Sequence, residues 1–273
     1  MIATDLAPAV KTCCADLYAQ DWVRLLLGDA FHPGGAALTR HLGTLLQLGP
    51  EDHVLDVASG PGASALELAR TFGCRVTGVD YSAEQVARAN AAARAAGLAE
   101  HVRFQQGDAE RLPFAAGSFD ALLCECAFCT FPDKETAASE FARVLRPGGC
   151  LALSDIALDP AKLPESLQGV LGVVACIADA RPAPQYMALL TAAGFANFHQ
   201  EDHAGALLEL VQQIDVRLLA VKVAAALGKL ELGAIDLTQA KPLLAEVRRQ
   251  IAAGNATYVA ITAGKPFKEA SQR

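Results

Sequence analysis

Residues 53–64, "HVLDVASGPGAS", hold the pattern from which the fold of this chain is predicted. Its first six residues are a short apolar run with β-branched valines, which predicts a buried strand. The glycine-rich "SGPGAS" comes next, and "ALELARTF" (65–72) then has a helical pattern. A glycine-rich turn lets the backbone approach a ligand closely, and the start of a helix presents free N–H groups. Taken alone, the same composition also suits a plain tight turn.

Strands and helices alternate beyond this point. Strands are predicted at "RVTGVD" (75–80), "HVRFQQGD" (101–108), "FDALLCEC" (119–126) and "CLALSDI" (150–156). Helices are predicted at "SAEQVARANAAARAAG" (82–97), with Ser82 as N-cap and Gly97 just past its end, and at "KETAASEFARVL" (134–145), which "RPGG" stops. This spacing is typical of βαβ units, and continuous apolar runs are typical of parallel strands buried on both faces.

The flanking segments predict one domain with helical additions. Residues 1–48 are predicted to form an N-terminal helical lid, broken at "FHPGG" (31–35), before a core at 49–158. Residues 159–273 are predicted to hold a loop on the substrate side, a helical cap and the last strands. The expected helices there are "APQYMALLTAAGF" and the stretches near 206–228 and 237–253, and the expected strands are "ANFHQEDH" and "ATYVAITA".

Composition narrows the class of protein. The 273 residues are 52% hydrophobic and 19% charged with a net charge of −7, which is typical of a globular domain. No Lys/Arg run stands out, so nucleic acid is not an expected partner. The N-terminus has no signal-peptide pattern, and no apolar run reaches the roughly 18 residues that span a bilayer. We therefore expect a cytoplasmic protein with no membrane partner, whose eight cysteines are reduced and serve metal-related or catalytic roles more often than disulfides.

Three signals at successive strand ends predict one ligand-binding crevice. They are the glycine-rich turn, Asp80 after the second strand and Asp108 after the third. Asp80 is placed to accept hydrogen bonds from a ribose diol, and Asp108 with the Ala109 N–H could read an adenine. The turn lacks both the G-x-G-x-x-G spacing and the Lys-Ser/Thr of a P-loop. A ligand with a ribose and an adenine but no phosphates therefore fits better than a nucleotide.

With these residues in view, the chain resembles the class I S-adenosylmethionine-dependent methyltransferases over roughly residues 50–156. The resemblance is carried by "VLDVASGPG", "GVDYS", "GDAERLPF", "FD" and "VLRPGGCLALSDI". It implies an α/β, Rossmann-like fold with a mainly parallel seven-stranded sheet and helices on both faces. It also implies a methyltransferase that uses S-adenosyl-L-methionine and releases S-adenosyl-L-homocysteine. One departure is that Ala58 stands where the first glycine of the turn is usual.

The resemblance assigns cofactor contacts by position. The methionine end would be surrounded by Asp56, Ala58, Ser59, Gly60 and Gly62. Asp80 would bind the ribose, Tyr81 would lie along the adenosine, and Asp108 with Ala109 would read the adenine. The implied cofactor site also includes Gln85, Gly107 and Glu125, the last as a contact to cofactor or substrate.

The stretch "CECAFCTFPDK" (124–134) raises the question of what the cysteines do. Cys74, Cys124 and Cys150 suit core packing, because an unpaired cysteine behaves as a small hydrophobe. Cys126 and Cys129 lie at the strand end beside the expected methyl group, so packing and function stay equally open. A structural zinc site is disfavoured because C-x-C-x-x-C lacks a second ligand pair, and no resident metal is predicted.

A narrower resemblance connects this region with the arsenite methyltransferases. Cys126 falls on their strand-end cysteine, and Cys176, in "VVACIADARPAPQYMALLTAAGF", falls on an arsenic-binding cysteine. Cys13 or Cys14 would supply a third thiolate, and glutathione or thioredoxin would be a thiol source. Thiolates select soft, thiophilic centres, whose lone pair could attack the methyl group with little acid–base help. The strand end differs from that group, the C-terminal part looks unlike it, and no cysteine follows Cys176.

Three functions therefore compete. The first is methylation of a thiol-bound metalloid such as arsenite through Cys126, Cys176 and Cys13 or Cys14. The second is methylation of a small organic acceptor of quinone or natural-product type at carbon, oxygen or nitrogen. Methylation of an acceptor hydroxyl requires a general base, and no His–Asp pair that could serve as one is evident in the sequence. The third is a soft-metal-binding or cofactor-sensing module without turnover. Cys129 and His32, in the loop at the pocket mouth, are predicted substrate contacts.

Overall fold

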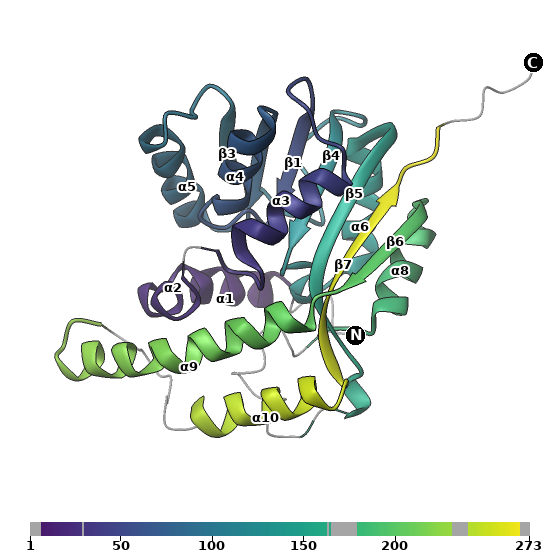
Figure 1. Ribbon diagram of the computed structural model, residues 1–273. Helices are drawn as coiled ribbons and strands as arrows, with labels where there is room; N and C mark the ends of the chain where they lie inside the picture. Colours follow the sequence, from purple (N-terminus) through teal and green to yellow (C-terminus); the bar gives the residue numbers. More distant parts are fainter. Residues whose placement is uncertain (1–6, 29, 163, 165–178, 231–239, 268–273) are drawn as a thin grey trace, which may run out of the picture.

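A seven-stranded sheet forms the centre of the computed structural model, which describes residues 7–28, 30–162, 164, 179–230 and 240–267. The strand order is β3-β2-β1-β4-β5-β7-β6 (Figure 1). The strands are β1 (His53–Val57), β2 (Arg75–Asp80), β3 (Val102–Gln106), β4 (Phe119–Glu125), β5 (Leu145–Leu158), β6 (Ala196–Asp202) and β7 (Ala256–Gly264). β1 to β5 pair in parallel, whereas β7 runs antiparallel to both β5 and β6. The predicted mainly parallel seven-stranded sheet is confirmed.

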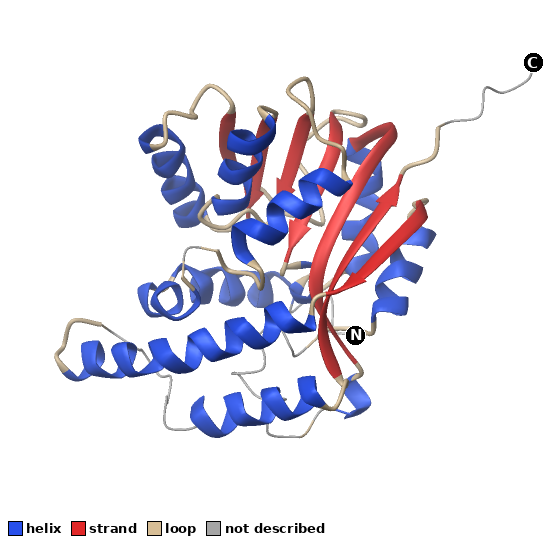
Figure 2. Ribbon diagram, in the orientation of Figure 1, coloured by secondary structure: helices blue, strands red, loops and turns tan. Residues whose placement is uncertain are grey.

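Helices cover both faces of this sheet (Figure 2). They are α3 (Gly35–Leu45), α4 (Ala63–Phe72), α5 (Ala83–Ala95), α6 (Lys134–Val144) and α8 (Ala183–Ala192). α3 packs on α4, and α6 packs on α8. Short 3-10 turns follow β4 at η1 (Phe128–Thr130) and β5 at η2 (Pro160–Lys162). Because both faces are covered, the central strands are buried throughout, as the apolar runs predict.

A helical roof lies over the carboxyl ends of the parallel strands. It consists of α1 (Ala7–Ala19), α2 (Asp21–Leu27), α9 (Ala204–Ala226) and α10 (Ala240–Ala252). Trp22 and Val23 of α2 are buried against Leu218 and Val221 of α9 in a small core of their own. The predicted lid and cap are therefore joined to each other by apolar packing.

Several strand boundaries differ from the predictions. β5 begins at Leu145 and not at residue 150, and "RPGG" forms an irregular part of the strand, where the pairing with β4 shifts register and Gly148 has a φ of 80°. The Gly148 N–H donates to the Lys265 carbonyl (2.8 Å), and the Lys265 N–H donates to the Gly149 carbonyl (2.8 Å), which ties this segment to the residue after β7. The third strand ends at Gln106, because Gly107 and Asp108 turn away toward the pocket.

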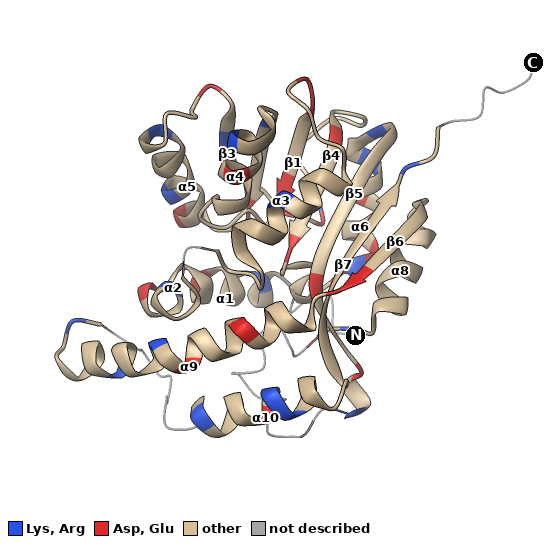
Figure 3. Ribbon diagram, viewed as in Figure 1, with Lys and Arg blue, Asp and Glu red and all other residues tan. Residues whose placement is uncertain are grey.

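Charged residues of both signs are interspersed along the helices and strands (Figure 3). Among the helices within the described ranges, none is both long and apolar enough to cross a bilayer.

Candidate active site

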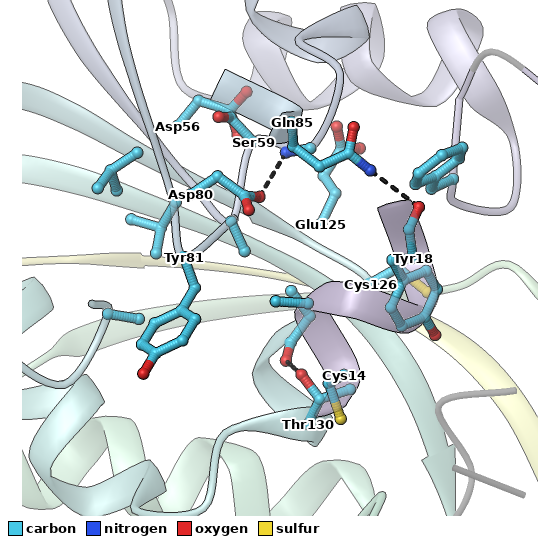
Figure 4. Close-up of a pocket in the computed structure, with 18 of the residues that line it drawn as sticks. Cys14, Tyr18, Asp56, Ser59, Asp80, Tyr81, Gln85, Glu125, Cys126 and Thr130 are labelled. Atoms are coloured by element: carbon cyan, nitrogen blue, oxygen red, sulfur yellow. Dashed lines mark hydrogen bonds between the residues drawn. The ribbon is translucent and has the colours of Figure 1, made fainter. Parts of the chain in front are cut away.

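A pocket opens at the carboxyl ends of β1, β2 and β4, and α1 lines its other side (Figure 4). Every predicted cofactor residue except Gly62 lines it: Asp56, Ala58, Ser59, Gly60, Asp80, Tyr81, Gln85, Gly107, Asp108, Ala109 and Glu125. His32, Cys14 and Cys126 of the predicted substrate and catalytic residues line it as well. The sheet therefore brings the three strand-end signals into one crevice.

The glycine-rich turn between β1 and α4 forms one wall. Ala58 adopts a φ of 57° and Gly60 a φ of 51°, both in the left-handed region. The Ser59 N–H donates to the Val79 carbonyl (3.0 Å), which fixes the turn against β2. Gly62 is not among the residues that line this pocket. Its φ is 89°, and a Cβ there would lie 2.5 Å from the Phe104 ring, so packing requires this glycine.

Asp80 is held at the end of β2 by backbone donors. Its Oδ2 accepts from the Gly60 N–H and its Oδ1 from the Ser82 N–H, each at 2.8 Å. Burial raises the pKa of Asp80, and these two hydrogen bonds oppose that rise. The carboxylate is thus oriented into the pocket next to Tyr81 (Figure 4).

Buried polar atoms without a hydrogen-bond partner gather at this pocket. Within the described part of the chain these atoms are Asp56 Oδ2, Ser59 Oγ, Gln85 Oε1 and Glu125 Oε1, and all four residues line the pocket. A buried polar group left without a partner costs about 1–3 kcal/mol. Burial, followed by the negative charges of Glu125 and Asp80, raises the pKa of Asp56 well above its ordinary value. A ligand that offers donors and positive charge would relieve both effects.

S-adenosylmethionine meets these requirements. It carries a sulfonium and an ammonium group, and four carboxylates line the pocket, from Asp56, Asp80, Asp108 and Glu125. Its ribose and amino groups supply the donors that the orphaned oxygens lack. The residues present therefore fit this cofactor.

Lys11 of α1 is a pocket residue that the sequence analysis missed. Its Nζ donates to Asp108 at 3.0 Å (Oδ1) and 2.7 Å (Oδ2), and also to Glu110. Burial alone would lower the pKa of Lys11, but Asp108 and Glu110 raise it overall. Asp108, the carboxylate predicted to bind the adenine, is therefore already paired with Lys11 of the roof helix α1.

A buried histidine–carboxylate pair lies on the other side of the pocket. Glu125 Oε2 accepts from Ser64 Oγ (2.6 Å) and Thr39 Oγ1 (2.9 Å), and His32 Nε2 lies 3.4 Å from it. His32 Nδ1 lies 3.1 Å from the Pro33 carbonyl, so Nδ1 carries the proton of that hydrogen bond.

No His–Asp pair was evident in the sequence, and the structure brings a histidine next to a glutamate instead. The loop before α3 brings His32 to the end of β4, although the two residues are far apart in the chain.

The predicted thiolate ligands do not all meet. Cys14 and Cys126 line the pocket (Figure 4), whereas Cys13 is exposed and is absent from the described lining. Cys129 is buried, and its backbone N–H donates to Asp155 (2.8 Å). It does not line the pocket either. Cys176 lies outside the described residues.

The cysteines predicted to pack in the core do so. Cys74 and Cys124 are buried, and Cys150 packs against the core. Burial raises the pKa of Cys74 to about 11, which makes it a poor thiolate.

The chain is similar to known methyltransferases. Residues 55–153 match the family described as "Methyltransferase domain". O-methyltransferase resE of Aspergillus sclerotiorum is 39% identical over 122 residues, covering 45% of this chain and 46% of that protein. The 27-O-demethylrifamycin SV methyltransferase of Amycolatopsis mediterranei is 36% identical over 171 residues, covering 60% of this chain and 61% of that protein. The chain thus spans less than two thirds of the length of these relatives.

A solved structure gives a further likeness. The [4+2]-cyclase SpnF has a TM-score of 0.71 and 26% identity, covering 90% of this chain and 93% of that one. The glycine-rich turn, Asp56 of β1 and Asp80 at the end of β2 all lie within the matched segment. Residues 55–153 therefore match a methyltransferase domain, and this match includes the residues that form one wall of the pocket.

Proposed function

We propose that this chain transfers the methyl group of S-adenosylmethionine to a small organic acceptor. The observation that carries the proposal is the set of four orphaned polar atoms, all on residues that line the pocket of a methyltransferase domain. Asp56, Ser59 and Gln85 would hold the cofactor, with Asp80 at its ribose. When bound, S-adenosylmethionine supplies an electrophilic methyl group on a positively charged sulfur.

Apolar side chains favour an apolar acceptor. Tyr18, Phe31 and Phe131 line the pocket, and the rings of Tyr18 and Phe31 lie 6.3 Å apart between centroids. Together with the roof, these rings would exclude water from the reacting groups. An aromatic or polyketide-like molecule suits such a surface better than a charged metabolite does.

Glu125 and His32 favour oxygen as the acceptor atom. Ser64 and Thr39 hold Glu125 Oε2, which leaves Oε1 buried, orphaned and available to take a proton from a hydroxyl. His32 Nε2 lies 3.4 Å from the same carboxylate oxygen, next to the hydroxyls of Thr39 and Ser64. The relatives named O-methyltransferase resE and 27-O-demethylrifamycin SV methyltransferase are in keeping with this choice.

Methylation of a thiol-bound metalloid such as arsenite is the second candidate. Its supporting observation is that Cys14 and Cys126, from α1 and from the end of β4, line the same pocket. Two thiolates could hold a soft centre, with a third supplied by glutathione or thioredoxin.

A third candidate is binding without methyl transfer. The likeness to the [4+2]-cyclase SpnF extends over most of both chains, and a fold alone does not determine the reaction.

Turnover separates the three candidates. The purified chain would be incubated with S-adenosylmethionine and either a hydroquinone, a catechol, a primary amine, or arsenite with glutathione, and S-adenosylhomocysteine would be measured. We expect S-adenosylhomocysteine to be released with a hydroxyl acceptor. A Cys14→Ser/Cys126→Ser variant should release it as well. Release with arsenite that this variant abolishes would support the metalloid instead. Cofactor binding without any release would argue for the module without turnover.

A further inference from the structure

A cluster of imidazoles surrounds one carboxylate on the far side of α3 from the pocket. His41 comes from α3, Glu201 from the edge strand β6, and His203 from the start of α9. One ligand atom from each of these three residues lies within 4.8 Å of the other two. His199 of β6 also points at the carboxylate, with its Nε2 3.1 Å from Glu201 Oε1.

The sequence places these groups together. In a strand, residues two apart point to the same face, so "HQEDH" (199–203) presents His199, Glu201 and His203 on one side. The antiparallel pairing of His199 with Thr262 and of Glu201 with Ala260 fixes that face. The His203 N–H continues the ladder by donating to the Tyr258 carbonyl (2.7 Å). α3 then brings His41 over the same face.

The distances suit a single ion. His41 Nε2 lies 2.7 Å and His203 Nε2 3.1 Å from Glu201 Oε2. Ligands around a tetrahedral zinc ion are about 3.4 Å apart at metal–ligand distances of about 2.0–2.1 Å. Small side-chain shifts would therefore convert the three hydrogen-bonded groups into a ligand set.

The solvent exposure of these side chains and the types of their ligand atoms also favour a metal site. The side chains of His41, Glu201 and His203 are 44%, 26% and 24% exposed, so an ion can enter and keep water in its remaining position. Imidazole nitrogens with one carboxylate suit zinc, nickel and copper better than magnesium or calcium.

We propose that His41, Glu201 and His203 bind a divalent transition-metal ion of the zinc class, with His199 as a fourth ligand or as a support for Glu201. The ion ties α3 to the β6–α9 corner. α3 also carries Thr39, which donates to Glu125, so the ion steadies a helix that supports the pocket. The site is separate from the pocket and does not depend on the proposed function.

Zinc chloride tests the site on the full chain after removal of metal with a chelator. Calorimetry would count the bound equivalents in wild type, His41→Ala and His203→Ala. His101→Ala is the matched control, because His101 is exposed and lies away from the cluster. Cobalt(II) in place of zinc would report the ligand type, since thiolate ligands give a near-ultraviolet charge-transfer band and imidazoles do not.

We expect one equivalent to bind wild type and His101→Ala, and both cluster variants to bind it at least ~10-fold more weakly. Zinc should raise the melting temperature of wild type and of the control only. Three results would overturn the proposal: no binding up to millimolar zinc, binding that His41→Ala or His203→Ala leaves unchanged, or a cobalt–thiolate band that assigns the ion to cysteines.

Discussion

Replacement of Glu125 by Gln tests the chemistry of the pocket directly. The amide keeps one oxygen to accept from Ser64 and Thr39, so the packing around Oε2 can persist. It places an NH₂ group at the orphaned Oε1 position, where it can no longer take a proton. The free energy of unfolding should therefore change by only about 1 kcal/mol.

Two roles of Glu125 give different magnitudes. If Oε1 receives the proton of an acceptor hydroxyl, kcat should fall about 10²- to 10⁴-fold while the Kd for S-adenosylmethionine stays constant. If Oε1 instead binds the cofactor ammonium, a lost charged hydrogen bond of about 1.5–3 kcal/mol should weaken the Kd about 10- to 150-fold. Kinetics with a hydroquinone acceptor and calorimetry with S-adenosylmethionine separate the two.

The matched control is Glu67→Gln, which removes a carboxylate that pairs with Arg40 on the surface. This control should leave both kcat and Kd unchanged. A Glu125→Gln variant with wild-type turnover and wild-type cofactor affinity would refute both roles and the reasoning from the orphaned oxygen.

Three other outcomes follow from the pocket geometry. Ala58→Gly should raise the free energy of unfolding by about 0.5–1 kcal/mol in denaturant titrations. The reason is that the strain of alanine at a φ of 57° outweighs the conformational entropy that glycine loses on folding. A free energy of unfolding below that of wild type would contradict this. Lys11→Met should speed proteolysis near α1, since it removes the tie to Asp108, whereas an unchanged cleavage rate would mean that packing alone holds the helix. The pKa of Asp56 is raised by burial above its ordinary 3.8, so its protonated form stabilises the ligand-free protein at low pH and that stability is lost as pH rises above 3.8. Asp56→Asn should flatten this part of the profile of melting temperature against pH, and an identical slope in both proteins would refute it.

Local patterns predicted the parts of the site that lie at strand ends. Asp56 lies near the end of the first apolar run, Asp80 and Asp108 follow the next two strands, and parallel pairing brings these positions to one edge of the sheet. The crowding of Gly62 by Phe104 could not be predicted, because the sequence does not distinguish a glycine that contacts a ligand from one that packing requires.

Contacts between segments that are distant in the chain could not be predicted from the sequence. His32 reaches Glu125 only through the path of the loop before α3, and Lys11 reaches Asp108 only because α1 folds back over the pocket. Neither residue belongs to a periodic pattern or a motif. The start of β5 at Leu145 was missed for a related reason, because the first residues of this strand form hydrogen bonds with Lys265 near the other end of the chain.

The roof also gives the protein a built-in optical probe. Trp22 is the only tryptophan in the sequence, and it is 3% exposed between α2 and α9. Its emission therefore reports on the roof alone and is insensitive to the sheet, while far-ultraviolet circular dichroism follows the whole fold. Denaturant curves recorded by the two signals would coincide if roof and sheet unfold as one cooperative unit. A red shift of the emission at lower denaturant would mean that the roof opens on its own, at a free energy that the curve itself measures.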